Sequence, residues 1–547
     1  MKNLFQKGIG ALVSKQTNIF SAALFIILTT IFSQLLGLFK YRILVSYFGA
    51  SNDLGVFFAA FRIPDFVFQV VIAGALSTSF IPIFSEYVGM GKRREADNFT
   101  SSLLTLGVIL YLVMSLTVIL FSYQLCQLVA PGFSPRELLL MSQFMIIIQL
   151  AQIFFILGTV STAVLQSLQH FLIPGIATAF YNLGIIFGLL LFVPMIGIYS
   201  ATVGVMIGSI FFFLVQLPML IHAGFRYKIT LDMSNGVMKV LHLMLPRSIT
   251  LIVTQLAITA NVFFASFLGA RSLVVFDLAQ TLVLAPVVLF GQSIAQASFP
   301  ALSQKKNDKK SFDAIFISSF NQILYLTLPL SALFIVLRIP LIRLFFGASR
   351  FDWSATVDTG RTLAYFSVSI AAQSLIYLLA RAFYAHKDTK TPLIVTLVAV
   401  LTNITLSYVF VLVLKLPIFF LAAAFSVSNI FAAFLLFVLL DYKIKLPKGQ
   451  IISSAIKIFV ATLIMGVALY VPLKLLDQLV FDTTKTINLL LLTGIASIAG
   501  LITYIFFTWM FAIQEARYVV EVVKKFRDRK LLLKQIGELI DGPKPTL

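Results

Sequence analysis

The sequence predicts an all-α polytopic membrane protein with about 14 transmembrane helices. Hydrophobic residues make up 60% of its 547 residues and charged residues only 11%, whereas a soluble domain carries about 25% charged residues. Apolar stretches long enough to cross a bilayer, about 20 residues each, begin near residues 21, 55, 100, 138, 172, 198, 241, 273, 314, 357, 391, 417, 450 and 486. No linker is long enough to separate soluble domains.

An internal repeat divides these spans into two sets. Segments 46–85 and 266–303 both open with Ser-aromatic-x-Gly-Ala and close with Phe, Pro and Ser in the same order. Three pairs of matching residues are separated by nearly the same number of positions along the chain: Pro82 and Pro300, Pro174 and Pro392, and Ser46 and Ser266. The separation is identical for the two proline pairs and slightly longer for the serine pair. Such internal symmetry is typical of transporters. It predicts two parallel six-helix lobes around a central cavity, followed by two C-terminal helices.

Basic residues predict the topology of the chain. Lysine and arginine collect at alternate ends of the spans, for example at 92–94, 305–310 and 443–448, which places these loops and both termini in the cytoplasm. An even number of spans separates the two repeat copies, so the copies are parallel. The expected segments are an interfacial helix at 1–20, an N-lobe at 21–223, a C-lobe at 224–440, two helices at 441–511 and a cytoplasmic amphipathic tail at 512–547.

Composition and motifs exclude several other classes of protein. The net charge of +20 lies in short loops rather than on one face of a soluble domain, so nucleic acid is not an expected partner. Cys126 is the single cysteine, which excludes an intramolecular disulfide and a cysteine metal cluster. There is no Gly-x-x-x-x-Gly-Lys-Ser/Thr loop, and the histidines lack metal-ligand spacing. We therefore expect no enzyme, no metal and no cofactor; the outer loops are mostly too short for a membrane glycosyltransferase.

The second span contains the most informative charges. Arg62 and Asp65 flank Pro64, which should bend or break the helix because proline lacks a backbone N–H. A charge at mid-bilayer costs roughly 2.5 to 3.5 kcal/mol, so Arg62 should not face lipid. It either lines a functional cavity or neutralises a buried carboxylate, for which Asp65 and Asp277 are the candidates.

Two other spans supply further candidates for a cavity site. Lys40 and Arg42 lie near the outer end of the first span and either line the cavity or extend to the outer headgroups. Asp277 and Gln280 lie near the start of the eighth span. The predicted substrate-binding residues are therefore Arg62, Lys40, Arg42, Asp277, Gln280 and Asp65.

Small residues recur at helical spacing in two consecutive spans. Gly184 and Gly188 lie in one, and Gly204 and Gly208 lie in the next. This spacing favours close packing of the two helices.

Motifs along the chain carry a resemblance to a known family. In the first half these are Ser33-Gln34-x-x-Gly37, Phe48-Gly49-Ala50, Phe57-Phe58-x-Ala60-Phe61-Arg62-x-Pro64, Gly74-Ala75-Leu76-Ser77 and Phe80-x-Pro82. In the second half they are Phe264-Ala265-Ser266-Phe267-Leu268, Phe299-Pro300-x-Leu302-Ser303 and Phe383-Tyr384-Ala385-x-x-Asp388-Thr389-Lys390-Thr391-Pro392. In order and spacing they resemble the MurJ/MviN lipid II flippases over roughly residues 20–440.

The resemblance implies the multidrug/oligosaccharidyl-lipid/polysaccharide exporter fold, with a V-shaped cavity and a lipid-tail groove formed by the two C-terminal helices. It implies a monomer in the bacterial cytoplasmic membrane, among membrane lipids, that moves lipid II by alternating access. Of the family's cavity charges, this chain keeps Lys40 and the basic residue at Arg62, whereas Gln34, Phe68 and Gln69 are uncharged.

Two alternatives stay open at this point. One is a flippase for another polyprenyl-diphosphate-linked oligosaccharide. The other is a cation-coupled drug exporter of the same superfold, which would depend on an intramembrane carboxylate such as Asp65 or Asp277.

Overall fold

The computed structural model describes residues 19–73, 80–479 and 485–516. Every regular element in these residues is a helix. Among them, 13 helices or runs of helices are long and apolar enough to cross a membrane, which confirms the all-helical membrane fold. The remaining predicted span, near residue 241, is α12 (Asn235–Ser266), whose described apolar stretch Leu251–Ser266 is shorter. The interfacial helix predicted at 1–20 and the tail predicted at 512–547 lie largely outside the described residues.

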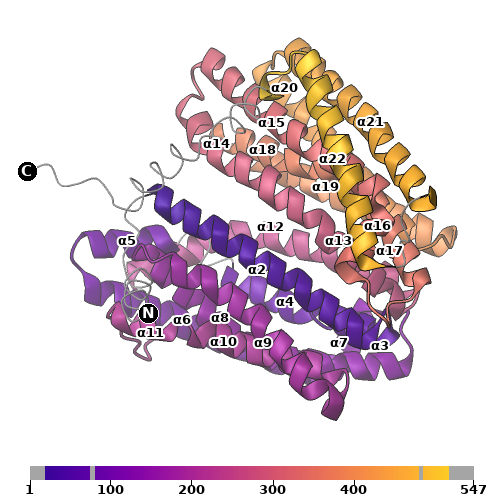
Figure 1. Ribbon diagram of the computed structural model, residues 1–547. Helices are drawn as coiled ribbons and strands as arrows, with labels where there is room; N and C mark the ends of the chain where they lie inside the picture. The colour runs from indigo at the N-terminus through magenta and orange to yellow at the C-terminus, as the bar shows by residue number, and fades with distance from the viewer. Residues whose placement is uncertain (1–18, 74–79, 480–484, 517–547) are drawn as a thin grey trace, which may run out of the picture. The chain divides into compact units, whose positions relative to one another are not determined.

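The chain divides into two compact units between Leu273 and Val274, and Figure 1 labels the helices of both. The first unit contains α2 (Ile19–Phe48), α3 (Asn52–Ala59), α4 (Arg62–Phe68), the π-helix η1 (Gln69–Ala73), α5 (Ile81–Gly89), α6 (Arg93–Leu120), α7 (Ser122–Val129), α8 (Pro135–Ser167), α9 (Leu172–Ile196), α10 (Tyr199–Leu214), α11 (Leu217–His222) and α12. Its central helix is α8, which contacts α3 to α7 and α9 to α11, while α2 packs along α9.

The second unit holds the remaining helices. They are α13 (Ala270–Pro286), whose first turn precedes the division, the π-helix η3 (Val287–Gln292), α14 (Ser293–Gln304), α15 (Lys309–Val336), α16 (Arg338–Phe346), α17 (Trp353–Ser367), α18 (Ile370–Ala385), α19 (Lys390–Ser407), the π-helix η4 (Tyr408–Val413), α20 (Phe419–Ile444), α21 (Lys448–Leu479) and α22 (Thr486–Met510). Here α15 contacts α14, α17, α18 and α21, and α20 contacts α17 to α19. The lobe bounds drawn from the sequence repeat stay a prediction.

The internal repeat is visible in the helix bounds. Four pairs of elements begin at one constant offset along the chain, the same offset that separates Pro82 from Pro300: α3 and α13 at Asn52 and Ala270, η1 and η3 at Gln69 and Val287, α8 and α17 at Pro135 and Trp353, and α9 and α19 at Leu172 and Lys390. Even the π-helix in the second span has its counterpart in the eighth. The duplication therefore extends from sequence motifs to backbone geometry.

The break expected at Pro64 is present, one turn before the proline itself. Pro64 has no N–H to donate to the carbonyl of Ala60, so α3 ends at Ala59 and α4 begins at Arg62. The N–H of Asp65 then bonds to the carbonyl of Phe61 (2.9 Å). This break places Arg62 at the start of a new helix.

The turn before α19 explains the Asp-x-Lys-Thr-Pro motif. The Asp388 carboxylate accepts hydrogen bonds from the backbone N–H (3.0 Å) and hydroxyl (2.9 Å) of Thr391, and from Nζ of Lys443 (2.6 Å) at the end of α20. Burial alone would raise the pKa of Asp388, but the bonds from Lys443 and Thr391 outweigh it and lower the pKa to about 2. Asp388 therefore ties the start of α19 to the end of α20 as an anion.

We predict that Asp388→Asn lowers the melting temperature of the detergent-solubilised protein at pH 7. The folded-state pKa of Asp388 lies below its unfolded value of about 3.9. The ionised carboxylate therefore stabilises the fold fully above about pH 3.9, and this stabilisation is lost as the pH falls towards 2. Melting curves of wild type and variant should therefore converge between those values. The exposed Asp232→Asn serves as control, and equal stability of Asp388→Asn and wild type at pH 7 would contradict this role.

Glycines bring α9 and α10 into backbone contact, as their spacing predicts. A Cβ at Gly184 would lie 2.4 Å from Cα of Gly208, and one at Gly188 would lie 2.4 Å from Cα of Gly204. Both distances are far inside van der Waals contact. Neither helix can move closer or accept a side chain there without shifting backbone.

We predict that Gly184→Ala lowers the free energy of unfolding by roughly 1 to 3 kcal/mol through overpacking. Gly466→Ala in α21 is the matched control, because nothing lies within 4 Å of its added Cβ. That control should be neutral or slightly stabilising, since alanine favours helix over glycine. Thermal unfolding in detergent measures both, and indistinguishable melting temperatures would contradict close packing at Gly184.

Candidate functional site

Arg62 and Asp65 form the charged centre of the first unit. Both side chains are half-buried in α4, and the positive charge of Arg62 acts directly on the Asp65 carboxylate. Nε2 of Gln152 in α8 donates a hydrogen bond to Oδ1 of Asp65 (3.1 Å). The structure thus brings two predicted residues together and adds Gln152, which the sequence interpretation missed.

A constant register between the second span and α8 creates this arrangement. Three side-chain pairs along it are each 87 residues apart: the rings of Phe57 and Phe144 (6.3 Å), Asp65 with Gln152 (3.1 Å), and the rings of Phe68 and Phe155 (5.3 Å). Two aromatic contacts, one on each side of the polar pair along the helix axis, therefore fix the position of Asp65 relative to Gln152. The same register sets Arg62 level with Gln149.

Gln149 is a second polar residue that the sequence interpretation missed. Its side chain is fully buried, and both amide atoms lack a hydrogen-bond partner among the described residues. Its backbone carbonyl accepts a hydrogen bond from the hydroxyl of Tyr111 in α6 (2.7 Å). The available signal was the Gln149-x-x-Gln152 spacing, which puts two amides on one face of an otherwise apolar helix.

Lys40 belongs to the same region of the first unit. Its Nζ lies 4.8 Å from the ring centroid of Tyr41, and that ring packs edge-on against Phe58 of α3 (5.8 Å). Tyr181 of α9 interacts electrostatically with both Tyr41 and Asp65. Lys40 is half-buried and contacts an aromatic face rather than extending from the helix into solvent.

Arg42 is half-buried on α2, two residues beyond Lys40. Its part in substrate binding stays a prediction.

Asp277 and Gln280 lie on α13 in the second unit. Both are half-buried, and their spacing of three residues places them on one face of the helix. The hydroxyl of Thr281 bonds to the carbonyl of Asp277 within the helix (2.7 Å). On this face of α13, the second unit thus offers one carboxylate and one amide.

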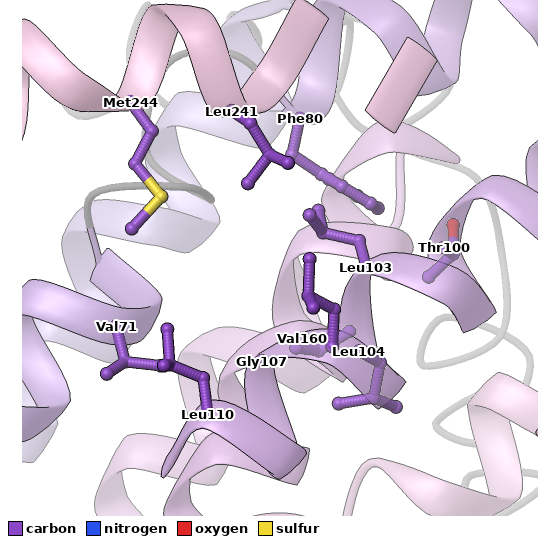
Figure 2. Close-up of a pocket in the computed structure, with 11 residues that line it drawn as sticks. Val71, Phe80, Thr100, Leu103, Leu104, Gly107, Leu110, Val160, Leu241 and Met244 are labelled. Atoms are coloured by element: carbon purple, nitrogen blue, oxygen red, sulfur yellow. The ribbon is translucent and has the colours of Figure 1, made fainter. Parts of the chain in front are cut away.

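The cavity in Figure 2 has a different character. It has a volume of about 50 Å³ and lies between η1, α6, α8 and α12, with Val71, Leu104, Val160 and Leu241 among its lining residues. Its one hydroxyl, on Thr100, bonds to the carbonyl of Ala96 in its own helix (2.8 Å). This is a packing void without charge, too small for a polar headgroup.

The basic side chains of the charged centre have the chemistry that suits an anion. Arginine presents a planar fork of donors that matches phosphate oxygens, and lysine adds a point charge. No group of three or more His, Cys, Asp or Glu residues in the described part of the chain could hold a metal ion.

Comparisons with known proteins agree with the motifs. The family model described as "Lipid II flippase MurJ" matches residues 44–491. A probable lipid II flippase MurJ of Buchnera aphidicola subsp. Acyrthosiphon pisum is 27% identical over 504 residues, covering 89% of this chain and 96% of the relative. The lipid II flippase MurJ of Thermosipho africanus is 28% identical over 443 residues, covering 81% of this chain and 90% of the relative.

Solved structures show the same relationship. A lipid II flippase MurJ in an inward closed conformation matches with a TM-score of 0.74 and 26% identity, covering 89% of this chain and 98% of that one. An inward-facing multidrug resistance MATE transporter of the MOP superfamily matches with a TM-score of 0.66 at 16% identity, covering 76% and 94%. The second likeness is one of fold alone.

Proposed function

Because the chain belongs to the MurJ family of lipid II flippases, we propose that it moves lipid II across the bacterial cytoplasmic membrane. The match of the family model over residues 44–491 carries this proposal. The 13 apolar spans found in the described part of the chain agree with a multi-pass inner-membrane protein. The activity is transport, so the protein binds and releases its substrate without making or breaking covalent bonds.

The chemistry of the substrate sets the requirement. A polyprenyl-diphosphate-linked glycan must carry an anionic, hydroxylated headgroup past hydrocarbon while its tail stays in lipid. Desolvated phosphate needs cations and hydrogen-bond donors. Arg62 supplies the bidentate contact to the diphosphate, and Lys40, with Arg42, supplies further positive charge. In the second unit, Asp277 and Gln280 supply hydrogen-bonding groups for the headgroup.

Arg62 has two alternative partners in this mechanism. Without substrate it interacts with Asp65, which keeps the charge of the centre low. When the diphosphate arrives, Arg62 turns towards it, and the hydrogen bond from Gln152 keeps Asp65 partly satisfied. Gln152 thereby reduces the cost of separating the pair, which would otherwise leave a buried carboxylate alone.

Transport proceeds by alternating access and requires an external driving force. The chain has no phosphate-binding loop for ATP. The membrane potential, an ion gradient or consumption of the product outside the cell supplies the bias. The protein acts as a monomer.

Both termini lie in the cytoplasm in this proposal. Cysteines introduced at the exposed positions Arg94 and Asn307 should react with an impermeant thiol reagent only from the cytoplasmic side, and those at Arg136 and Ser349 only from outside. Labelling of intact cells and inverted vesicles measures this. Reaction of position 307 from outside would overturn the parallel arrangement of the repeats.

The proposed role of Arg62 makes a specific forecast. Arg62→Ala should abolish headgroup flipping in proteoliposomes while the melting temperature stays near that of wild type, because the hydrogen bond from Gln152 keeps Asp65 partly satisfied. Arg62→Lys should keep part of the activity, since a point charge remains but the fork is lost. Arg136→Ala, an exposed arginine of the same unit, is the control and should flip normally.

A purely structural ion pair would behave differently. Arg62→Ala would then destabilise the protein by roughly 3 to 5 kcal/mol through the uncompensated carboxylate. Adding Asp65→Asn would restore both stability and flipping. Recovery of flipping in that double variant contradicts substrate binding by Arg62.

A further inference from the structure

In the second unit, residues of α14 and α15 line an open groove of about 500 Å³. Its polar lining residues are Ser298 on α14 and Ser318, Ser319 and Gln322 on α15, and Ile294 and Ile315 contribute apolar surface beside them. Among the described residues, none of those that line it is charged. The volume is in the range of about 300 to 1,000 Å³ that is typical of small-molecule sites.

The polar groups of the groove have unused hydrogen-bonding capacity. Nε2 of Gln322 donates to Oγ of Ser318 (3.1 Å), and Ser298 bonds only within its own helix. Ser319 is 7% exposed, and its hydroxyl has no hydrogen-bond partner in the described part of the chain. Both helices belong to membrane spans, where polar groups need a polar partner or water.

The first repeat shows what the same row of residues does when the chain covers it. A similar row of polar residues lies on α6: Ser101, Ser102 and Thr105. These residues precede Ser318, Ser319 and Gln322 on α15 by a constant number of positions, which is one fewer than the repeat offset. There, the backbone N–H of Lys228 bonds to Oγ of Ser101 (3.2 Å), and the hydroxyl of Tyr227 lies 3.0 Å from that of Thr105. The loop between α11 and α12 therefore covers Ser101 and Thr105, although the hydroxyl of Ser102 has no hydrogen-bond partner among the described residues. In the described part of the chain, the row on α15 lines an open groove instead.

We propose that this groove, named here the serine groove after Ser298, Ser318, Ser319 and Gln322, binds the uncharged glycan of the lipid-linked substrate. The inference rests on the proposed flippase function and deepens it. Serine hydroxyls and a glutamine amide both donate and accept, as sugar hydroxyls require. The absence of cations from the lining disfavours the diphosphate, and the row of polar groups disfavours the polyprenyl tail. Ile294 and Ile315 suit the apolar faces of a sugar ring.

Native mass spectrometry of the full-length protein with two ligands tests this assignment. The ligands are lipid II and the bare polyprenyl diphosphate of the same chain length. The double variant Ser319→Ala with Gln322→Leu removes hydroxyl and amide without adding bulk. It should weaken binding of lipid II about tenfold, the effect of losing one to two hydrogen bonds, and leave the bare diphosphate unchanged. Ser298→Phe, which fills the groove, should give the same selectivity.

Ser102→Ala is the matched control, because Ser102 lies within one position of the place that corresponds to Ser319 in the first repeat and is 2% exposed. It should bind both lipids as wild type does. Unchanged lipid II affinity in both groove variants would overturn the glycan site, even if the wild type flips lipid II. Equal weakening towards both lipids would also overturn it. If the wild type binds neither lipid, the flippase function itself falls, and the glycan site with it.

Discussion

The cost of a guanidinium in hydrocarbon is the constraint on which the first unit depends. Arg62 can occupy a membrane span because Pro64 ends α3 and because the Asp65 carboxylate, held by Gln152 of α8, lies within reach of its charge. The register of the second span against α8, held by Phe57 with Phe144 and by Phe68 with Phe155, delivers Gln152 to Asp65 at the required height. The aromatic packing therefore positions the polar groups: shifting either helix by one turn would separate Asp65 from Gln152 and leave the buried carboxylate without this hydrogen bond.

Duplication supplied two copies of one scaffold, and the side chains of the two copies have since diverged. Arg62 and Gln280 are separated by the repeat offset itself, so they hold the same place in the repeat, yet only one is charged. The polar rows of α6 and α15 correspond within one position of that offset, and in the described part of the chain only the second row lines an open groove. In the proposed function, the charged first copy binds the anionic diphosphate and the uncharged groove of the second copy binds the neutral glycan.

Much of this architecture follows from sequence, because spans, repeat and helix break arise from local chemistry: apolar length, recurring motifs and the missing N–H of Pro64. The candidate site follows only in part. Gln149 and Gln152 are ordinary residues until the register sets them against α4, and the bond from Lys443 to Asp388 joins residues 55 positions apart. Hydroxyls on a membrane helix usually bond to their own backbone, so the open serine groove has no sequence signal of its own.

The most direct test of the account is the accessibility of lipid II in vesicles reconstituted with the wild-type protein. An impermeant reagent that modifies the headgroup reaches only the outer leaflet of sealed, protein-free vesicles. A flippase should make the inner-leaflet pool reactive as well, while a trapped soluble dye shows that the vesicles stay sealed. An identical reactive fraction with and without correctly folded protein would contradict the assignment of this chain as a flippase.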